Sequence, residues 1–426
     1  MPRVALLSQL SGEQMKFISV ATYAGILACA LVQPVWAREP AKFTERVVYS
    51  FCSQQGCADG YYPEASLVAE NGNLYGTTNG GGSTACHGHG CGTVFSLDPD
   101  TGTETVVYAF LDGPDGAHPK AGLVDVKGIL YGTTYKGFHR NGKGHGSKGR
   151  GAVFSLDPIT DTLKVIHIFT GGRDGEHPVA GLIDIKSVLY GTTFWGGASR
   201  GGTVFRVSRN HDKEKVVYSF CGQPYCTDGR EPVSGLIDVN GVLYGTTRLG
   251  GNTSCNSAGC GTIFSLNPST GLETVVYAFS GSSTGSNPYA GLINENGILY
   301  GTTTGSGSGN GIVFSFDTDT GVEKEIYAFR GGADGFDPWA GLINVRGLLY
   351  GTTRFGGGNG CGGAGCGTVF SLDPNTGAET VVHSFSGDAD GEFPTAALID
   401  VNGTLYGTTL QGGAHHRGTV FALTKQ

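Results

Sequence analysis

The stretch 235-GLIDVNGVLYGTTRLGGNTSCNSAGCGTIFSLNPSTGLETVVYAF-279 contains the unit from which most of this chain is built. It holds four short runs rich in β-branched and aromatic residues, namely GLIDV, VLYGTT, GTIFSLN and ETVVYAF. Turn-forming residues separate the runs, and Asn240-Gly241 between the first two is a pair typical of tight β-hairpins. The stretch therefore predicts four consecutive antiparallel strands.

The string LYGTT within this unit recurs along the chain. Successive copies are 56, 59, 54, 56, 50 and 56 residues apart, and they begin at Leu74, Leu130, Leu189, Leu243, Leu299, Leu349 and Leu405. A unit of this length cannot bury its apolar face alone and must pack on its neighbours. Seven four-stranded units predict an all-β fold, a seven-bladed β-propeller of antiparallel blades.

The two ends of the repeat array indicate how the ring closes. The first strand-like segment, ERVVYSF at 45–51, matches the fourth strand of a unit that lacks its first three. The last unit stops after its third strand, GTVFAL at 418–423. An open β-solenoid would not need this exchange, so we expect the N-terminal strand to complete the last blade and close the ring.

The first 37 residues have the pattern of a secretory signal peptide. Residues 17–33 are mostly apolar, Lys16 precedes them, and Val35-Trp36-Ala37 fits a small-residue cleavage site. We expect cleavage after Ala37 and a true start at Met15, with a lipoprotein box at Cys29 as a weaker alternative. No second hydrophobic span is seen near the C-terminus, so a secreted protein without a transmembrane anchor is expected, extracellular or periplasmic.

The charge of the mature chain, residues 38–426, argues against one class of partner. Without the leader, 26 of the 28 basic and 35 of the 36 acidic residues remain, which gives a formal charge of −9. An acidic surface of this kind is unsuited to nucleic acid. We expect a monomer with no nucleic-acid partner.

The ten cysteines of the mature chain form five pairs with one spacing, C-x4-C. In an exported chain such pairs predict local disulfides. Metal binding is the alternative, and it is best supported between Cys86 and Cys91, where His87 and His89 add two imidazoles. The other pairs lack histidines, which favours disulfides, and the pairs are Cys52 with Cys57, Cys86 with Cys91, Cys221 with Cys226, Cys255 with Cys260, and Cys361 with Cys366.

One face of the predicted propeller carries the long loops, and a motif Asp-Gly-x-x-Pro recurs there. The fifth unit departs from it, with Thr284 at the aspartate position. Six equivalent carboxylates could surround the axis and bind sugar hydroxyls or a cation such as calcium, although a turn-forming role is favoured because aspartate recurs in turns for local reasons. No other cofactor is expected, and the six are Asp59, Asp115, Asp174, Asp228, Asp334 and Asp390.

Aromatic and basic residues gather on the same predicted face. The residue that follows LYGTT varies between units, and such variation at a fixed position of a repeat is typical of a recognition surface. Loops on a rigid scaffold commonly carry binding residues. Aromatic rings stack on the C–H faces of sugars, and arginine binds their polar groups. The candidate ligand-binding residues are Tyr135, Phe194, Trp195, Arg200, Arg248, Trp339, Arg354 and Phe355.

Taken together, the repeat resembles the bacterial GloVer-type tandem repeat of exported proteins. The resemblance rests on LYGTT, the Gly-rich loop, GTVF and the F-x-G-x-x-D-G-x-x-P segment, and it covers nearly all of the mature chain. It implies export but no activity; the surface anchor that often ends such proteins is not found here.

No enzyme signature such as G-x-S-x-G or H-E-x-x-H is present. We therefore expect a non-catalytic protein that binds glycan or another surface polymer through its loop-rich face. A polysaccharide hydrolase or lyase is the first alternative, with Asp174 and Glu176, or His177 and Arg200, as its candidate pairs. A protein-interaction platform is the second.

Overall fold

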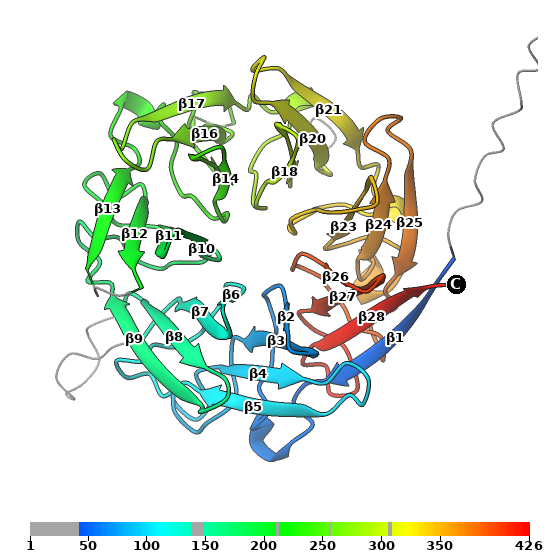
Figure 1. Cartoon of the computed structure of the whole chain (residues 1–426). Coiled ribbons are helices and arrows are strands. Elements are labelled where there is room, and N and C mark those ends of the chain that lie inside the picture. Colours follow the sequence, from blue (N-terminus) through cyan, green and yellow to red (C-terminus); the bar gives the residue numbers. More distant parts are fainter. Residues whose placement is uncertain (1–41, 138–148, 210–212, 256, 306–308) are drawn as a thin grey trace, which may run out of the picture. The chain divides into compact units, whose positions relative to one another are not determined.

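Seven four-stranded antiparallel sheets form the blades of a closed ring (Figure 1). The computed structural model describes residues 42–137, 149–209, 213–255, 257–305 and 309–426. The predicted signal peptide lies outside the described residues, so its cleavage site remains a prediction. The all-β propeller predicted from the repeats is confirmed.

Each blade runs from a short strand at the ring's centre to a long strand at its rim. Blades one to three are β2 (Val68–Glu70), β3 (Asn73–Thr78), β4 (Thr93–Leu97), β5 (Glu104–Ala109); β6 (Val124–Val126), β7 (Ile129–Thr134), β8 (Ala152–Asp157), β9 (Thr162–Ile168); and β10 (Ile183–Ile185), β11 (Val188–Thr193), β12 (Thr203–Ser208), β13 (Glu214–Ser219). Blades four to six are β14 (Ile237–Val239), β15 (Val242–Thr247), β16 (Thr262–Leu266), β17 (Glu273–Ala278); β18 (Ile293–Glu295), β19 (Ile298–Thr303), β20 (Ile312–Asp317), β21 (Glu323–Ala328); and β22 (Ile343–Val345), β23 (Leu348–Thr353), β24 (Thr368–Leu372), β25 (Glu379–Ser384).

The seventh blade is built from both ends of the chain. Its strands are β26 (Ile399–Val401), β27 (Thr404–Thr409), β28 (Thr419–Lys425) and, at the rim, β1 (Phe43–Ser50). β1 pairs antiparallel with β28, from Phe43 opposite Lys425 to Ser50 opposite Thr419, and the two lie side by side in Figure 1. The predicted closure by the N-terminal strand is confirmed.

The geometry of the second strand explains why LYGTT repeats without change. In the first blade Leu74 is buried, and a Cβ on Gly76 would lie 2.5 Å from the ring of Phe95. Thr77 Oγ1 donates to the Ala121 carbonyl of the next blade (3.3 Å). Thr78 Oγ1 shares a 2.8 Å hydrogen bond with Thr93 Oγ1 of the third strand. The leucine, the glycine and the two threonines of the motif therefore have packing or hydrogen-bonding roles; the bond between threonines of the second and third strands recurs in the blades whose third strand begins with threonine.

The hydrophobic core lies between the blades. The phenylalanine that follows the fourth strand of one blade packs edge to face on the third-strand phenylalanine of the next, as Phe110 does on Phe154 with ring centroids 5.4 Å apart. Phe169 and Phe205 repeat this contact at 5.0 Å. Buried alanines such as Ala121 line the inner ends of the blades. Because each contact joins two blades, the ring is stabilised as one unit.

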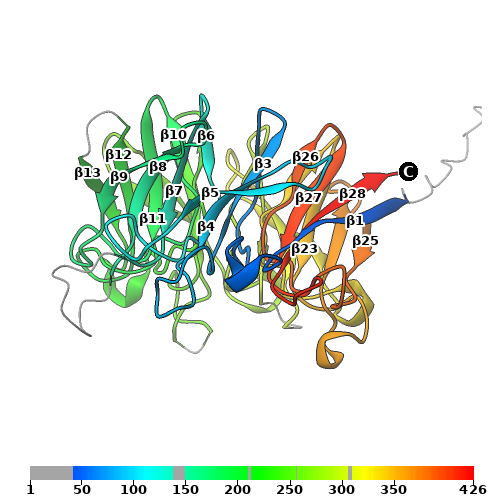
Figure 2. The same ribbon diagram turned by 90° about the horizontal axis from the view of Figure 1, so that it is seen from below.

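The two faces of the ring differ in the loops that they carry (Figure 2). Tight turns join first to second and third to fourth strands, whereas the longer connections lie on the opposite face. These include the short 3-10 helices η1 (Gln55–Cys57), η2 (Pro224–Cys226), η3 (Ser282–Thr284), η4 (Gly332–Asp334) and η5 (Cys361–Gly363). We call this side the loop-rich face.

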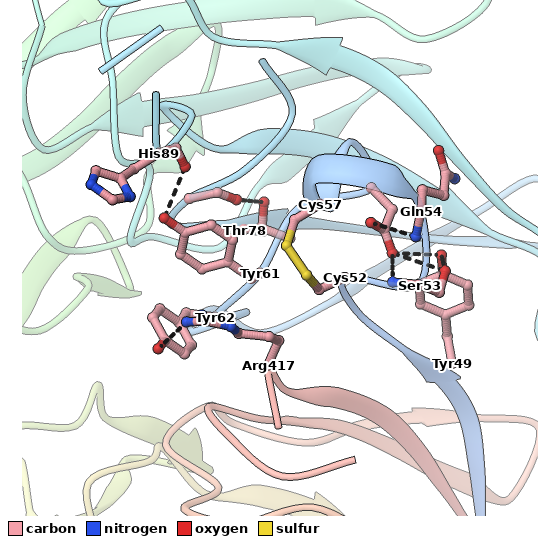
Figure 3. The surroundings of a disulfide bond; sticks show 12 residues. Tyr49, Cys52, Ser53, Gln54, Cys57, Tyr61, Tyr62, Thr78, His89 and Arg417 are labelled. Carbon is pink, nitrogen blue, oxygen red and sulfur yellow. Dashed lines mark hydrogen bonds between the residues drawn. A yellow bond between two sulfur atoms is a disulfide. The ribbon is translucent and has the colours of Figure 1, made fainter. Parts of the chain in front are cut away.

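All five predicted disulfides are formed, and all lie in connections of the loop-rich face. Figure 3 shows the Cys52–Cys57 disulfide beside Tyr49 and Ser53. Cys86 and Cys91 are also joined, so their sulfurs are not thiolate ligands for a metal. In the part of the chain that the structure describes, no helix has the length and apolar character to cross a membrane.

Candidate functional site

A repeated loop geometry forms the mouth of the central channel on the loop-rich face. In every blade the residue before the conserved proline has a left-handed backbone, with φ between 55° and 61°. In the second blade this residue is His118, whose N–H donates to the Cys91 carbonyl of the first blade (2.7 Å) and whose carbonyl accepts from Tyr135 N–H (3.1 Å). These hydrogen bonds hold the strained backbone and fix the proline's neighbours at the mouth.

A cavity of about 450 Å³ lies at this mouth. All seven residues that directly follow the prolines line it, namely Glu64, Lys120, Val179, Val233, Tyr289, Trp339 and Thr395. Four of the residues that follow LYGTT complete its wall, namely Tyr135, Phe194, Arg354 and Leu410. The cavity wall is thus made of positions that differ between blades, whereas the frame that holds them is repeated.

The channel behind the mouth is different in character. It has a volume of about 390 Å³ and shares the seven residues after the prolines, but the rest of its wall is mainly the repeated Ala-Gly-Leu segments. Small side chains leave backbone exposed to the channel and offer little to distinguish one ligand from another. Chemical diversity is therefore concentrated at the mouth.

One side of the mouth is a layered aromatic cluster. The rings of Tyr289 and Trp339 are nearly parallel, at 6° with centroids 4.7 Å apart. The Arg354 guanidinium lies 4.5 Å from the centre of the Trp339 ring and 5.0 Å from that of Phe355. Trp339 Nε1 donates to Asp337 Oδ1 (2.9 Å), which fixes the indole. Trp339 thus lines the cavity with its ring already engaged by two neighbours.

Arg248 belongs to the fourth blade and is paired through its two terminal guanidinium nitrogens, while its Nε has no hydrogen-bond partner among the described residues. Its guanidinium donates to Tyr289 Oη (2.7 Å) and forms an ion pair with Glu231 (2.9 Å). It also lies 5.9 Å from the Phe194 ring centre. Arg248 therefore braces two cavity-lining aromatic rings, Phe194 and Tyr289.

The other side of the mouth carries a cation and a carboxylate. Lys120 Nζ forms an ion pair with Glu64 (3.0 Å) and lies 5.4 Å from the ring centre of Tyr135. Asn79 Nδ2 donates to the second oxygen of Glu64 (2.9 Å). These polar groups are partly exposed, so they can exchange partners with a bound molecule at low cost.

The remaining predicted aromatic and basic candidates lie outside the cavity wall. Trp195 is 42 % exposed and packs on Phe194 with ring centroids 4.8 Å apart. Phe355 contacts Phe336 at 5.2 Å, and Arg200 is exposed in a loop of the third blade. The structure thus brings Tyr135, Phe194, Trp339 and Arg354 together and places Arg248, Trp195 and Phe355 beside them.

The six repeated aspartates have turn contacts near the outer strands. Asp59, fully buried, accepts from Ser53 N–H (2.8 Å), from Gln54 N–H (3.3 Å) and from the Tyr49 hydroxyl (2.9 Å), among the groups drawn in Figure 3. Asp228 repeats this pattern. None of the six lines the mouth cavity or the channel, within the described residues. The turn-forming interpretation explains these hydrogen bonds.

Two of the candidate catalytic residues are engaged elsewhere. Asp174 accepts from Thr170 and lies 3.6 Å from His167 Nε2, while Glu176 forms an ion pair with Arg150. Burial alone would raise the pKa of Asp174, but hydrogen bonds from His167 and Thr170 outweigh it and lower the pKa to about 2. A carboxylate held this way is a poor proton donor near neutral pH.

Across the described ranges, no group of three or more His, Cys, Asp or Glu side chains is arranged to hold a metal ion. Two of the residues that directly precede the prolines have shifted pKa values. Burial raises the pKa of Asp337, and the Trp339 hydrogen bond and the Arg354 charge offset this only in part. Burial also lowers the pKa of His118, which favours its neutral form. Calcium binding remains a prediction.

Of the residues that follow the prolines, sequence reasoning identified Trp339 and missed the others, including Glu64, Lys120 and Tyr289. The sequence does contain a signal for them. The position before Ala-Gly-Leu changes in type from blade to blade, as does the position after LYGTT, while its neighbours repeat. Comparing all seven units position by position would have identified both sets.

Solved structures share the fold with low sequence identity. An oligogalacturonate lyase from Vibrio parahaemolyticus is 9 % identical, with a TM-score of 0.51 over 90 % of this chain and 97 % of that one. The GH74 enzyme of Niastella koreensis is 13 % identical, with a TM-score of 0.52 over 82 % of this chain and 51 % of that one. A europium-containing methanol dehydrogenase is 10 % identical, with a TM-score of 0.50 over 89 % and 93 %. Such different proteins show the fold alone.

No curated protein sequence matches the chain. The profile of the Gloeobacter/Verrucomicrobia repeat matches residues 35–145, 142–364 and 253–426, which together cover all seven LYGTT units. These are the units that build the seven blades and present the variable residues of the mouth. The chain therefore belongs to the Gloeobacter/Verrucomicrobia repeat family.

Proposed function

We propose that this propeller is a non-catalytic binding protein that takes up a glycan at the mouth of its loop-rich face, outside the cell or in the periplasm. The observation that carries the proposal is the lining of the 450 Å³ cavity, in which the residues that vary between blades converge on one hollow. Five disulfides are consistent with an oxidising location.

The chemistry of the lining favours a sugar over a purely apolar ligand. Phe194 and Tyr135 offer aromatic surface, and Trp195 adds an exposed ring beside them. Lys120 and Glu64 supply a donor and an acceptor in the same hollow, with Lys120 Nζ 5.4 Å from the Tyr135 ring centre. Aromatic surface with a few converging polar groups suits a ligand that has C–H faces and hydroxyls.

The proposal is tested by screening the mature protein, residues 38–426, against neutral and acidic polysaccharides with and without calcium. Phe194→Ala and Trp195→Ala should each weaken binding by about tenfold, the scale of one lost aromatic contact. Tyr225→Ala is the matched control, because Tyr225 is 83 % exposed on the same face but lies in the Cys221–Cys226 loop.

Other outcomes would redirect the proposal. Equal loss for Tyr225→Ala would mean that the mouth is not the binding site. Shortened polymer chains after incubation would favour a hydrolase or lyase. Binding to no polysaccharide, with a protein retained instead, would favour an interaction platform.

A further inference from the structure

We propose that the mouth cavity selects a sugar that bears an oxyanion, a carboxylate or a sulfate ester, and that Arg354 binds this group. The inference rests on the proposed glycan binding and names the class of glycan. It follows from a difference between Arg354 and the other two cations at the mouth.

Arg354 is a cavity-lining guanidinium without a polar partner in the described part of the chain. Its contacts are with rings: its guanidinium carbon lies 4.5 Å from the centre of Trp339, 5.0 Å from that of Phe355 and 6.0 Å from that of Phe393. Its Nε, like that of Arg248, is buried and has no hydrogen-bond partner among the described residues, but Arg354, unlike Arg248, has no polar partner there for its terminal nitrogens either. Arginine carries five N–H donors in a planar fork, and a bidentate oxyanion matches that fork.

The other cations at the mouth are already neutralised. Lys120 is paired with Glu64 at 3.0 Å. Arg248 is paired with Glu231 at 2.9 Å and donates to Tyr289 Oη. An incoming oxyanion would have to displace a carboxylate from either of them, whereas at Arg354 it would meet unoccupied donors.

The acidic residue near Arg354, Asp337, does not form an ion pair with it. Asp337 directs Oδ1 to the indole N–H of Trp339 at 2.9 Å and forms no ion pair with Arg354. Burial raises the pKa of Asp337, which makes its negative charge less favourable. The Asp337 carboxylate and the Arg354 charge act on one another, but Arg354 has no ion-pair partner among the described residues.

The aromatic surroundings prepare Arg354 for an anion. Trp339 is held by the parallel ring of Tyr289 at 4.7 Å, so the guanidinium rests on a fixed surface. A side chain ordered before binding loses less entropy when the ligand arrives. A guanidinium among rings also has less competition from water, which strengthens its hydrogen bonds to an oxyanion.

The test compares polymers that differ only in charge. The mature protein is titrated with polygalacturonate and with the same polymer after its carboxyl groups are reduced to alcohols, and with dextran sulfate against dextran. Charge-assisted hydrogen bonds predict at least about tenfold tighter binding to the charged member of a pair. The pair that shows the preference distinguishes a carboxylate from a sulfate, and added salt should weaken it.

Matched arginine variants assign the preference to its residue. Arg354→Gln should remove it and leave binding of the neutral polymer, and Arg354→Lys should retain part of it. Arg330→Gln should retain all of it, because Arg330 is exposed in the loop after β21 and does not line the cavity. Loss in Arg330→Gln with none in Arg354→Gln would overturn the assignment. Competition by free galacturonate but not galactose, measured on the unaltered protein, gives a readout that no folding defect can affect.

The two proposals fail in different ways. Equal affinity for charged and neutral polymers would overturn the oxyanion inference and leave glycan binding intact. Absence of binding to every polymer would overturn the proposed function itself.

Discussion

At the scale of single residues, the glycine of LYGTT is required by packing. In the fifth blade a Cβ on Gly301 would lie 2.6 Å from the ring of Phe314 and 2.8 Å from a methyl group of Leu292. Overpacking of this kind costs about 1–3 kcal/mol. We expect Gly301→Ala to lower the free energy of unfolding by that amount, measured by denaturant titration.

The same blade supplies the control. A Cβ on Gly291 would meet no atom closer than 3.8 Å, and neither glycine has a positive φ. Gly291→Ala should therefore leave the free energy of unfolding nearly unchanged. Equal destabilisation by both substitutions would contradict the packing explanation.

The candidate site could be predicted from single residues only in part. Trp339 and Arg354 stand out in the sequence by their chemistry, and the structure places both at the cavity. Tyr289 was missed because its role depends on the neighbouring blade, which brings Trp339 to 4.7 Å from it. The aspartates, including Asp59, could not be assigned a distance from the axis, because the curvature of the blade-to-blade loops sets that distance and no single repeat encodes it.

At the scale of elements, β1 is the fourth strand of the seventh blade. It carries Val48, buried against the first blade, and Phe51, fully buried at its end, lies 5.0 Å from Phe95. The sequence allows this pairing to be predicted because ERVVYSF has the residue pattern of every other fourth strand. The strand boundaries of the hairpins follow from the same repetition.

Removal of β1 should open the ring. A chain that begins after Phe51 leaves β28 with an unpaired edge, and such edges promote association. We expect this chain to be aggregated or unfolded by size-exclusion chromatography and circular dichroism. A chain that begins at Lys42 retains β1 and should remain folded, and equal behaviour of the two chains would contradict closure by β1.

The disulfides are elements of the loops, and each spans a sequence separation of five residues. Loops this short give roughly 2 kcal/mol per bridge by chain entropy. We expect no free thiol in the denatured, unreduced mature protein. Reduction should lower the melting temperature while the strands still form below it, as checked by far-ultraviolet circular dichroism; loss of the strands on reduction at low temperature would contradict a local role.

At the scale of the whole molecule, the rim of the ring carries a set of acidic pairs whose glutamates are half-buried. Each pair joins an aspartate of a blade-to-blade loop with the glutamate that begins the next blade's fourth strand. Burial is the main cause that raises the pKa of these glutamates, and the aspartate adds to it. The pKa is raised to about 7 in each of Glu104, Glu214, Glu273 and Glu379.

These pairs predict how stability depends on pH. A carboxyl group whose pKa is raised from 4.5 to about 7 on folding binds its proton more tightly in the folded state. Its contribution to the free energy of unfolding is complete when the pH is below the pKa of the unfolded state, and it is lost as the pH rises from 4.5 to about 7. Asp390 acts in the opposite sense, because hydrogen bonds from His383 and Ser386 outweigh burial and lower its pKa to about 2. Stability should therefore be greatest between these ranges, at about pH 4–5.

Because several of these glutamates titrate over the same pH range, the effect should be visible in the melting temperature of the intact ring. We expect a lower melting temperature at about pH 8 than at about pH 4.5. We expect Glu273→Gln to reduce that difference, because the glutamine stays neutral at both pH values. Asp161→Asn is the control, since Asp161 is exposed in the turn between β8 and β9 and should leave the profile unchanged. A melting temperature that rises from pH 4.5 to pH 8 in the unaltered protein would mean that these rim glutamates are ionised in the folded state and that another group balances their charge.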